Sequence, residues 1–210
     1  MIVHINGKYA NKYQELMIKS FNFRHKYFVE TKKWMELEKP DRCETDEFDH
    51  EKAHHILYVI DDQVRGYARL TPMSAATLLA DLHSFLVTEK LNLRSQNYLE
   101  WTRFCVDDDW TAENPTHHVG ARLIAAMFEF GFENRFTHIL GEGNPNWVPK
   151  LKRLGLNIEP IGFPHFFDEE PTIAMKMVVN EESARRTKVV ARIKGRCIIC
   201  TSNEPLAISA

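Results

Sequence analysis

The chain has 210 residues, enough for one domain with a sizeable core, so we expect a single domain. Its 27 Lys and Arg residues nearly balance its 29 Asp and Glu residues, and this excludes a strongly basic nucleic-acid-binding protein. There is no apolar run of roughly eighteen residues, so we expect no transmembrane helix. The opening MIVHINGKYANKY has no basic segment followed by an apolar core, and the four cysteines suggest no disulfide framework. We therefore expect a protein of the reducing cytoplasm.

The N-terminal part predicts a short strand and then a long helix. Residues 2–5 alternate between apolar and polar side chains, as in a half-buried strand. Residues 10–34 carry apolar side chains at steps of three and four, without Gly or Pro. Arg24 lies on this apolar stripe one turn before Phe28, so it is either buried with partners or extends its head group to solvent. Trp34 lies near the end of the helix.

An acidic segment without apolar periodicity follows the helix. Between Glu36 and Lys52 there are eight carboxylates and three Lys or Arg residues. One interpretation is a solvated loop. The other is the wall of a pocket for a small cation, because buried carboxylates need a cationic partner to remain ionised. Within this segment we expect Phe48 to anchor the loop to the core, Glu47 to face solvent and Glu44 to be structural.

The central part predicts a hairpin and a third strand. Residues 54–60 and 64–71 read as strands joined at Asp61-Asp62-Gln63, and the second carries Arg69. Residues 98–106, YLEWTRFCV, are rich in aromatic and β-branched residues. Glu100 and Arg103 are three residues apart in that strand, which places them on opposite faces of an ideal strand. If both serve one pocket, the strand must contain a β-bulge.

The C-terminal part alternates helices and strands. We predict helices over 119–136 and 146–154, the second closed by Gly155, and strands over 137–140, 158–161 and 172–179. This order is typical of a mixed α/β fold with crossover helices. We assign residues 1–180 to the domain. Residues 181–210 form a basic C-terminal tail, helical or partly disordered, with six Lys or Arg residues and no acid over 183–200.

Several unusual residues now fall into an ordered series. The series is Arg24-x-x-x-Phe28, Trp34, Glu44-x-Asp46-x-Phe48-Asp49, Arg69-Leu-x-Pro72 and Glu100-x-x-Arg103-Phe104. It resembles the LuxI-type acyl-homoserine-lactone synthases, the autoinducer synthases of quorum sensing, from about residue 5 to residue 165. The resemblance implies an α/β fold like that of the N-acetyltransferase (GNAT) superfamily, with a mixed twisted sheet that is splayed centrally and flanked by helices.

The resemblance also implies a reaction. Such enzymes take an acyl group from acyl-carrier protein, or in some members from coenzyme A, and transfer it to the amine of S-adenosylmethionine. The product then lactonises and releases methylthioadenosine. S-adenosylmethionine is a substrate here, and we expect no cofactor and no metal.

The residues suit the binding of S-adenosylmethionine on physical grounds. Asp46 and Asp49 offer negative charge to its sulfonium and ammonium groups, while Arg24 and Arg69 can bind its carboxylate or brace the two acids. An aromatic wall against the cation or the adenine can come from Phe28 and Trp34.

For catalysis, the candidate general base is Glu100, with Arg103 as its ion-pair partner and Arg69 close by. Backbone N–H groups near residues 104–106 are candidate donors to the thioester oxyanion. The structural alternative for all these charged residues is an ion-pair network without catalysis.

The acyl group needs an apolar pocket, for which we expect the liners Phe104, Leu123, Met127 and Leu140. Gly141 and Gly143 leave room for a bulky or branched acyl group. Acyl-carrier protein is acidic, so its docking surface is expected to be basic, on the tail or on Lys150, Lys152 and Arg153. The Gly-rich acyl-CoA loop of other acetyltransferases is absent, which favours a carrier-protein donor, with acyl-CoA still possible.

Two other functions stay open at this point. One is a GNAT-type N-acyltransferase that uses acyl-CoA on another amine, and the other is a non-catalytic module that binds the same ligands. Cys197 and Cys200 have CxxC spacing, but no second pair accompanies them, so a redox or zinc role has little support.

Overall fold

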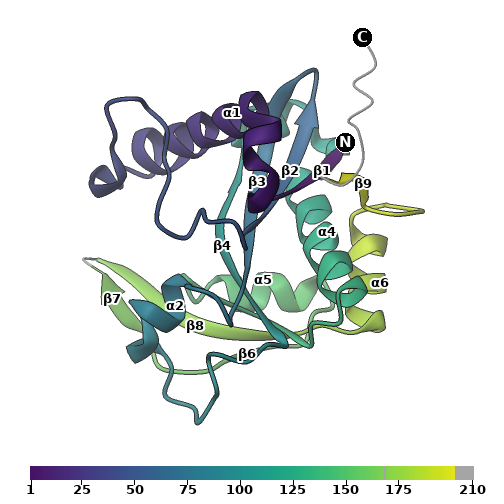
Figure 1. The fold of residues 1–210 in the computed structure, drawn as a ribbon. Coiled ribbons are helices and arrows are strands. Elements are labelled where there is room, and N and C mark those ends of the chain that lie inside the picture. Colours follow the sequence, from purple (N-terminus) through teal and green to yellow (C-terminus); the bar gives the residue numbers. More distant parts are fainter. Residues whose placement is uncertain (168, 202–210) are drawn as a thin grey trace.

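The computed structural model describes residues 1–167 and 169–201, and its nine strands form one mixed sheet (Figure 1). The strand order is β6-β8-β5-β4-β3-β2-β1-β9, and β7 pairs with β8 outside this path. The strands are β1 Ile2–Asn6, β2 His54–Ile60, β3 Gln63–Pro72, β4 Tyr98–Val106, β5 His138–Gly143, β6 Ile158–Pro160, β7 His165–Phe167, β8 Glu170–Val178 and β9 Ile198–Thr201.

Helices cover both faces of this sheet. They are α1 Gln14–His25, α2 Leu78–Asp81, α3 Asp108–Glu113, α4 Val119–Glu133, α5 Trp147–Arg153 and α6 Glu181–Val190. Short 3-10 turns and one π-helical turn add η1 Gly7–Tyr13, η2 Lys26–Thr31, η3 Met35–Leu37, η4 Ser84–Leu86 and η5 Pro115–His117. The predicted strands and helices are therefore present, with boundaries that differ by a few residues and with the long N-terminal helix divided into η1, α1 and η2.

The hairpin between β2 and β3 turns at the residues that the sequence indicates. Ile60 pairs with Gln63, so the loop has two residues, and Asp61 and Asp62 both have positive φ, at 48° and 58°. Two successive residues with positive φ form the primed turn whose twist matches that of the flanking strands, and Asp tolerates this conformation. The register set by this turn shifts by one residue between Tyr58 and Val59, and the shifted register brings His55 opposite Arg69.

The sheet opens between its two central strands. β4 and β5 run parallel and pair only over Tyr98–Trp101 and His138–Gly141. Beyond Trp101, β4 continues to pair with β3, while Glu142 and Gly143 of β5 continue to pair with β8. A mixed sheet that is splayed at its centre and flanked by helices is thereby confirmed.

The two faces of the sheet carry separate cores. On one face α4 packs with buried Leu123, Met127 and Phe128 against residues of the sheet, including Trp101 and Met175. On the other face α1 and η2 cover Val3, Leu57, Tyr67 and Cys105, and the loop containing α2 and η4 covers Leu140 and Ala174. Because side chains alternate along a strand, neighbouring residues of β4 serve different cores.

Residues 181–201 pack against the rest of the chain. Helix α6 starts with a capping box between Asn180 and Ser183, lies beside α4 in Figure 1, and buries Ala184 and Thr187. Strand β9 pairs in parallel with β1. The side chain of Cys200 lies outside the described part of the chain.

A buried carboxylate attaches this C-terminal segment to α4. Glu129 is 2% exposed and accepts hydrogen bonds from the backbone N–H groups of Cys197 (2.7 Å) and Ile198 (3.1 Å). It also forms an ion pair with Lys188 of α6. One side chain thus satisfies two backbone donors and one cation that would otherwise have to be hydrated.

We expect Glu129→Ala to destabilise the protein by about 2–3 kcal/mol, because it leaves two buried N–H groups and a cation without their acceptor. Glu133→Ala is the matched control on the same helix, since Glu133 lies at the surface, 42% exposed, in an ion pair with Arg196. That control should change stability by less than about 0.5 kcal/mol. Urea unfolding of the three proteins measures both values, and equal losses in the two variants would contradict the assigned role of Glu129.

Candidate active site

Two fully buried arginines organise the candidate site. Arg24 comes from α1 and Arg69 from β3, and neither has any exposed surface. Both donate to Asp49 Oδ1, Arg24 from Nη1 at 2.7 Å and Arg69 from Nη1 at 2.8 Å. Arg69 Nη2 also donates to Asp46 Oδ2 at 3.0 Å. The Arg24 head group therefore does not extend to solvent, and it braces the acidic loop from the helix.

A β-bulge in β4 adds a third arginine to this cluster. Tyr67 pairs with Cys105 and Arg69 pairs with Thr102, so two steps along β3 correspond to three along β4. Within that extra step, Arg103 has a φ of 53°. The expected bulge is thus confirmed, and a residue with positive φ redirects its side chain. The Arg103 guanidinium reaches Glu44 Oε1 (3.1 Å) and Asp46 Oδ2 (2.9 Å).

The pairing of Arg103 corrects one prediction. Arg103 was expected to orient Glu100, whereas its guanidinium binds the acidic loop. The physical reason is the bulge, which turns Arg103 towards Glu44 and Asp46. Glu44 is itself fully buried and accepts from Arg24 Nε as well.

The acidic loop is folded back on itself and pinned to the sheet. Asp46 accepts a hydrogen bond from the N–H of Phe48 (2.9 Å), and Asp49 Oδ2 accepts one from the N–H of Asp46 (2.9 Å). Phe48 is 3% exposed and anchors the loop, while Glu47 is exposed to solvent. The expectations for these two residues are confirmed. The loop is neither a solvated charge run nor a free anionic wall, because three carboxylates face three guanidinium groups.

The electrostatics of the cluster follow from this balance. Burial alone would raise the pKa of the Asp49 carboxyl, but Arg24 and Arg69 hold it far below its usual range. Burial and the two arginines lower the pKa of His55 to about 3, against an opposing effect of Asp49, so this imidazole is neutral at pH 7. His55 Nδ1 lies 2.6 Å from the Tyr67 hydroxyl, which also accepts from Arg24 Nη1 at 3.2 Å.

His55 and Tyr67 are members of the cluster that the sequence analysis missed. A usable signal was present for Tyr67, which lies two residues before Arg69 on the same face. The position of His55 opposite Arg69 follows from the register shift between Tyr58 and Val59.

The aromatic candidates form a stacked pair beside the arginines. Phe28 lies in η2, a π-helical turn of a kind that often marks functional sites. Its ring stacks on Trp34 with centroids 5.2 Å apart, and the Arg103 guanidinium lies 5.6 Å from its centroid. Phe28 is buried, whereas Trp34 is 41% exposed. The pair therefore lies at the boundary between the buried cluster and solvent.

Glu100 occupies a different environment from the other acids. It is 1% exposed and accepts from the N–H groups of Leu78 (3.2 Å) and Leu79 (2.5 Å). Burial raises its pKa to about 7, although these two N–H groups and Arg69 favour the charged form. A buried carboxyl that titrates near neutral pH has the property required of a general base.

The four expected acyl-pocket residues are not brought together. Phe104, Leu123 and Met127 lie on the α4 face of the sheet, whereas Leu140 is buried on the opposite face, the one that carries Glu100. Leu123 and Met127 are fully buried members of the core.

Phe104 belongs to an aromatic cluster at the opening of the sheet. Its ring centroid lies 5.2 Å from that of Trp101 and 5.7 Å from that of Trp147, which the sequence analysis did not select. A side chain on Gly141 would meet the carbonyl of Trp101 at 3.2 Å, and one on Gly143 would meet the ring of Trp147 at 3.5 Å. Because these two positions have no side chain, the backbone of Trp101 can approach Gly141 and the ring of Trp147 can approach Gly143.

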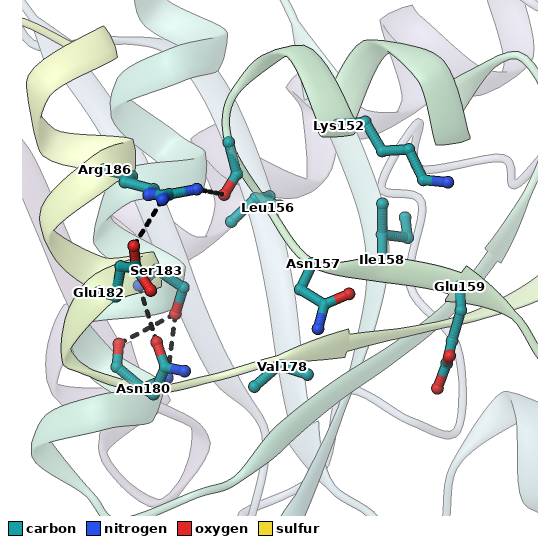
Figure 2. A pocket seen from close by; sticks show the side chains of 11 residues that line it. Lys152, Leu156, Asn157, Ile158, Glu159, Val178, Asn180, Glu182, Ser183 and Arg186 are labelled. Carbon is teal, nitrogen blue, oxygen red and sulfur yellow. Dashed lines mark hydrogen bonds and ion pairs between the residues drawn. The ribbon is translucent and has the colours of Figure 1, made fainter.

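The three expected docking residues on α5 are exposed. Lys150 lies over the ring of Trp147, with its Nζ 5.4 Å from the centroid, and Lys152 and Arg153 follow towards the end of the helix. Lys152 also borders a surface pocket of about 550 Å³ between α5, α6 and the adjoining strands (Figure 2). In Figure 2 the polar groups of Arg186, Asn180 and Ser183 are engaged by neighbours. This pocket holds none of the residues predicted for chemistry.

Among the described residues there is no His, Cys, Asp or Glu group arranged to hold a metal ion. In the same part of the chain, no helix combines the length and apolarity needed to cross a membrane.

The splayed mixed sheet flanked by helices is similar in fold to N-acyltransferases of the GNAT type. The structure of an acyl-CoA N-acyltransferase from Pseudomonas aeruginosa has this fold, with a TM-score of 0.55 and 15% identity, covering 84% of this chain and 97% of that one. Over residues 8–187 the chain matches the family described as autoinducer synthase. The chain belongs to the autoinducer synthase family, which confirms the resemblance and the prediction of an acyltransferase.

Individual relatives agree with this assignment. The chain is 24% identical over 183 residues to an isovaleryl-homoserine lactone synthase of Bradyrhizobium diazoefficiens, covering 87% of this chain and 82% of the relative. It is similar in structure to BjaI, described as a CoA-dependent acyl-homoserine lactone synthase with S-adenosylmethionine (SAM) and isopentyl-CoA. That match has a TM-score of 0.86 at 22% identity and covers 95% of this chain and 92% of BjaI. LasI, described as an AHL synthase, matches with a TM-score of 0.68 and 19% identity, covering 83% of this chain and 88% of LasI.

We expect Asp49→Asn to destabilise the protein by about 3 kcal/mol, because it leaves two buried guanidinium groups with too little negative charge. The lowered pKa of Asp49 adds stability that is present above pH of about 4 and is lost as the pH falls further, so the difference between wild type and variant should shrink in acid. Glu47→Gln is the matched control in the same loop. Urea unfolding at pH 7 and pH 3.5 gives the comparison, and a pH-independent difference would contradict this account.

Proposed function

We propose that the protein synthesises an acyl-homoserine lactone by moving an acyl group from a thioester to the amine of S-adenosylmethionine, followed by lactonisation and release of methylthioadenosine. The observation that carries the proposal is the buried Glu100, with its pKa near 7, beside an arginine-braced acidic loop in a chain of this family. The proposed base, Glu100, thus lies beside a rigid loop that carries charged side chains.

The loop and the aromatic pair supply the binding features for S-adenosylmethionine. Asp46 is 11% exposed, so one edge of the carboxylate set faces the solvent side, where a sulfonium or ammonium group can approach. Arg24 Nη2 is buried and, among the described residues, has no hydrogen-bond partner, which leaves a donor for the substrate carboxylate. The faces of Phe28 and Trp34 suit the adenine or the sulfonium.

Acyl transfer requires a free amine and a stabilised oxyanion. In this proposal Glu100 removes a proton from the ammonium group, directly or through water, so that the amine can attack the thioester carbonyl. Beyond Trp101, the edge of β4 that faces β5 has no strand partner within the described residues. Backbone N–H groups on that edge can donate to the oxyanion as the thiol leaves.

Lactonisation then depends on conformation. The carboxylate of the acylated product attacks the carbon next to the sulfonium, and methylthioadenosine departs as a neutral leaving group. No further base is needed for this step, so the protein contributes mainly by holding the chain in the folded geometry. The rigid, fully paired loop with Asp46 and Asp49 is suited to that task.

For the acyl donor we favour acyl-CoA over acyl-carrier protein. BjaI and MesI, both described as CoA-dependent synthases, match with TM-scores of 0.86 and 0.83, against 0.68 for LasI. The carrier protein remains the alternative, with Lys150, Lys152 and Arg153 as its proposed dock. A short or branched acyl group fits best, because Trp101, Phe104 and Trp147 occupy the opening of the sheet.

The direct test is incubation with S-adenosylmethionine and isovaleryl-CoA, with mass spectrometry for methylthioadenosine and acyl-homoserine lactone. Both products are expected in equal amounts. The same acyl group on acyl-carrier protein tests the donor. Absence of methylthioadenosine with every acyl thioester would contradict the proposed function, and acylated amine without lactone would point to another N-acyltransferase reaction.

We expect Glu100→Gln to lower kcat by about 10²–10⁴, the usual contribution of a general base, while the fold is kept. In the wild type, kcat/KM should rise with pH through about 7, because the base must be ionised, and this rise should be absent from the variant. Glu159→Gln is the control, since Glu159 is an exposed carboxylate on β6. Near-normal turnover of the Glu100→Gln variant would remove Glu100 from this role.

Trp147→Ala should move the acyl preference towards longer chains, because it removes a ring from the cluster that fills the opening. We expect the ratio of kcat/KM for octanoyl-CoA to that for isovaleryl-CoA to rise about tenfold or more, the scale set by a few buried methylene groups. Trp110→Ala is a matched control on α3, where the ring contacts His117 and Arg65 instead. An unchanged ratio in the Trp147 variant would place the acyl pocket elsewhere.

A further inference from the structure

The proposed reaction releases one proton per turnover, and this proton must travel from a buried side chain to solvent. The ammonium group of S-adenosylmethionine loses one proton before attack and a second as the amide forms. The departing thiolate takes up one of these, and lactonisation neither consumes nor releases a proton. One proton per turnover must therefore reach water, yet its first acceptor, Glu100, is 1% exposed. The inference that follows rests on the proposed function.

A second acid lies on the same face of the sheet as Glu100. Glu100 pairs in register with Leu140 of β5, and Glu142 is two residues further along that strand, so its side chain is on the same side. Glu142 is 12% exposed on its side chain. Its Oε1 lies at hydrogen-bond distance, 2.7 Å, from His83 Nδ1. Its Oε2 is buried and has no hydrogen-bond partner within the described residues.

His83 continues the connection towards solvent. It follows α2, the same short helix whose Leu78 and Leu79 N–H groups bind Glu100. Its side chain is 23% exposed and lies against the ring of Phe167, with centroids 4.9 Å apart. The chain of groups therefore runs from a buried carboxyl, through a partly buried carboxyl, to an imidazole at the surface.

We propose that Glu142 and His83 form the exit path for the proton that Glu100 takes from the substrate amine. The proton passes from Glu100 to the unpartnered Oε2 of Glu142, across a bridging water where needed. Rotation of the protonated Glu142 carboxyl brings its O–H to Nδ1 of His83, which accepts the proton in the tautomer that carries its own proton on Nε2. The imidazolium then releases the Nε2 proton to solvent. Glu100 and Glu142 are both ionised again, and exchange with solvent restores the imidazole tautomer.

The electrostatics agree with this order of transfer. A hydrogen bond to Glu142 raises the pKa of His83, against the effect of partial burial. Burial raises the pKa of Glu100 to about 7, and the charge of Glu142 adds to that effect. The charge of Glu100 in turn contributes to raising the pKa of His83. The charge of Glu142 thus acts on both Glu100 and His83.

The other charged groups on the surrounding elements are engaged elsewhere. On α2, Asp81 holds Arg94, and on β8, Lys176 holds Glu89 and Glu159.

Two further groups border the three residues of the proposed path directly. Arg69 faces Glu100 from β3 but is bound by Asp46 and Asp49. On β7, His165 contacts the rings of Phe85 and Phe167, beside His83. No cation other than His83 is paired with Glu142 in residues 1–167 and 169–201.

The test is His83→Ala, assayed by methylthioadenosine release with and without added imidazole. We expect kcat at pH 7 to fall about tenfold or more, KM for both substrates to stay within about twofold, and tens of millimolar imidazole to restore several-fold of the lost rate. The matched control is His165→Ala, which removes the other imidazole of the same surface and should show neither the loss nor the restoration. Thermal unfolding of each variant confirms that it is folded.

A second variant tests the path from the other end. Glu142→Gln should shift the acidic limb of the kcat/KM profile to lower pH, because it removes one of the charges that raise the pKa of Glu100. When Glu142→Gln is combined with His83→Ala, added imidazole should no longer restore the rate. Wild-type kcat in His83→Ala, or a loss that imidazole leaves unchanged together with an unshifted Glu142→Gln profile, would overturn the inference. Failure of the proposed function itself would appear as no methylthioadenosine from the wild type.

Discussion

The site depends on the burial of two guanidinium groups. Arg24 and Arg69 have no exposed surface, and each would carry a large desolvation cost without its carboxylates. Such pairs contribute little net stability, because attraction and desolvation nearly cancel. The ion pairs instead hold the acidic loop in a fixed position. The segment around Asp46 and Asp49 has no apolar periodicity with which to pack, so hydrogen bonds to arginines on α1 and β3, together with the Phe48 anchor, hold it in place.

The bulge in β4 places the acids of the loop, which are paired with arginines, and Glu100 in different environments. Because Arg103 turns towards Glu44 and Asp46, no guanidinium of the described residues is hydrogen-bonded to Glu100, whose pKa is about 7. A direct ion pair between Arg103 and Glu100 would lower that pKa and weaken the carboxylate as a base. The single extra residue therefore does two things. It completes the charge balance of the loop, and it leaves Glu100 in an environment where burial is the largest influence on its pKa.

The sequence predicted what depends on periodicity and local chemistry. The hairpin at Asp61 and Asp62, the long helix α4 and the need for a bulge between Glu100 and Arg103 all follow from side-chain alternation and turn preferences. It gave the bracing of Asp46 and Asp49 by Arg24 and Arg69 as one alternative, and the structure shows those pairs. It did not predict the partner of Arg103, because spacing defines the face of a residue but not its neighbour across the sheet. Arg103 was assigned to Glu100 for that reason.

Three further contacts depend on strand register and on loops that bring distant segments together. They are His55 opposite Arg69, His83 with Glu142, and Trp147 against Phe104. The basic composition of residues 183–200 likewise did not reveal that α6 packs on α4.

The opening between β4 and β5 explains why the expected site residues are divided between two cores. Glu100, Thr102 and the arginine cluster face α1 and α2, whereas Trp101 and Phe104 face α4 and contact Trp147 of α5. A continuous sheet would keep these faces apart, since its backbone hydrogen bonds leave no passage. Where β4 and β5 stop pairing after Trp101 and Gly141, that barrier ends. Under the proposed function, the amine held on one face and the thioester carbonyl on the other can meet only there. The bulge in β4, and the edge of β4 that has no strand partner in the described part of the chain, lie within a few residues of that point. In the proposed mechanism the base, the oxyanion donors and both substrates therefore converge on a single gap in the sheet.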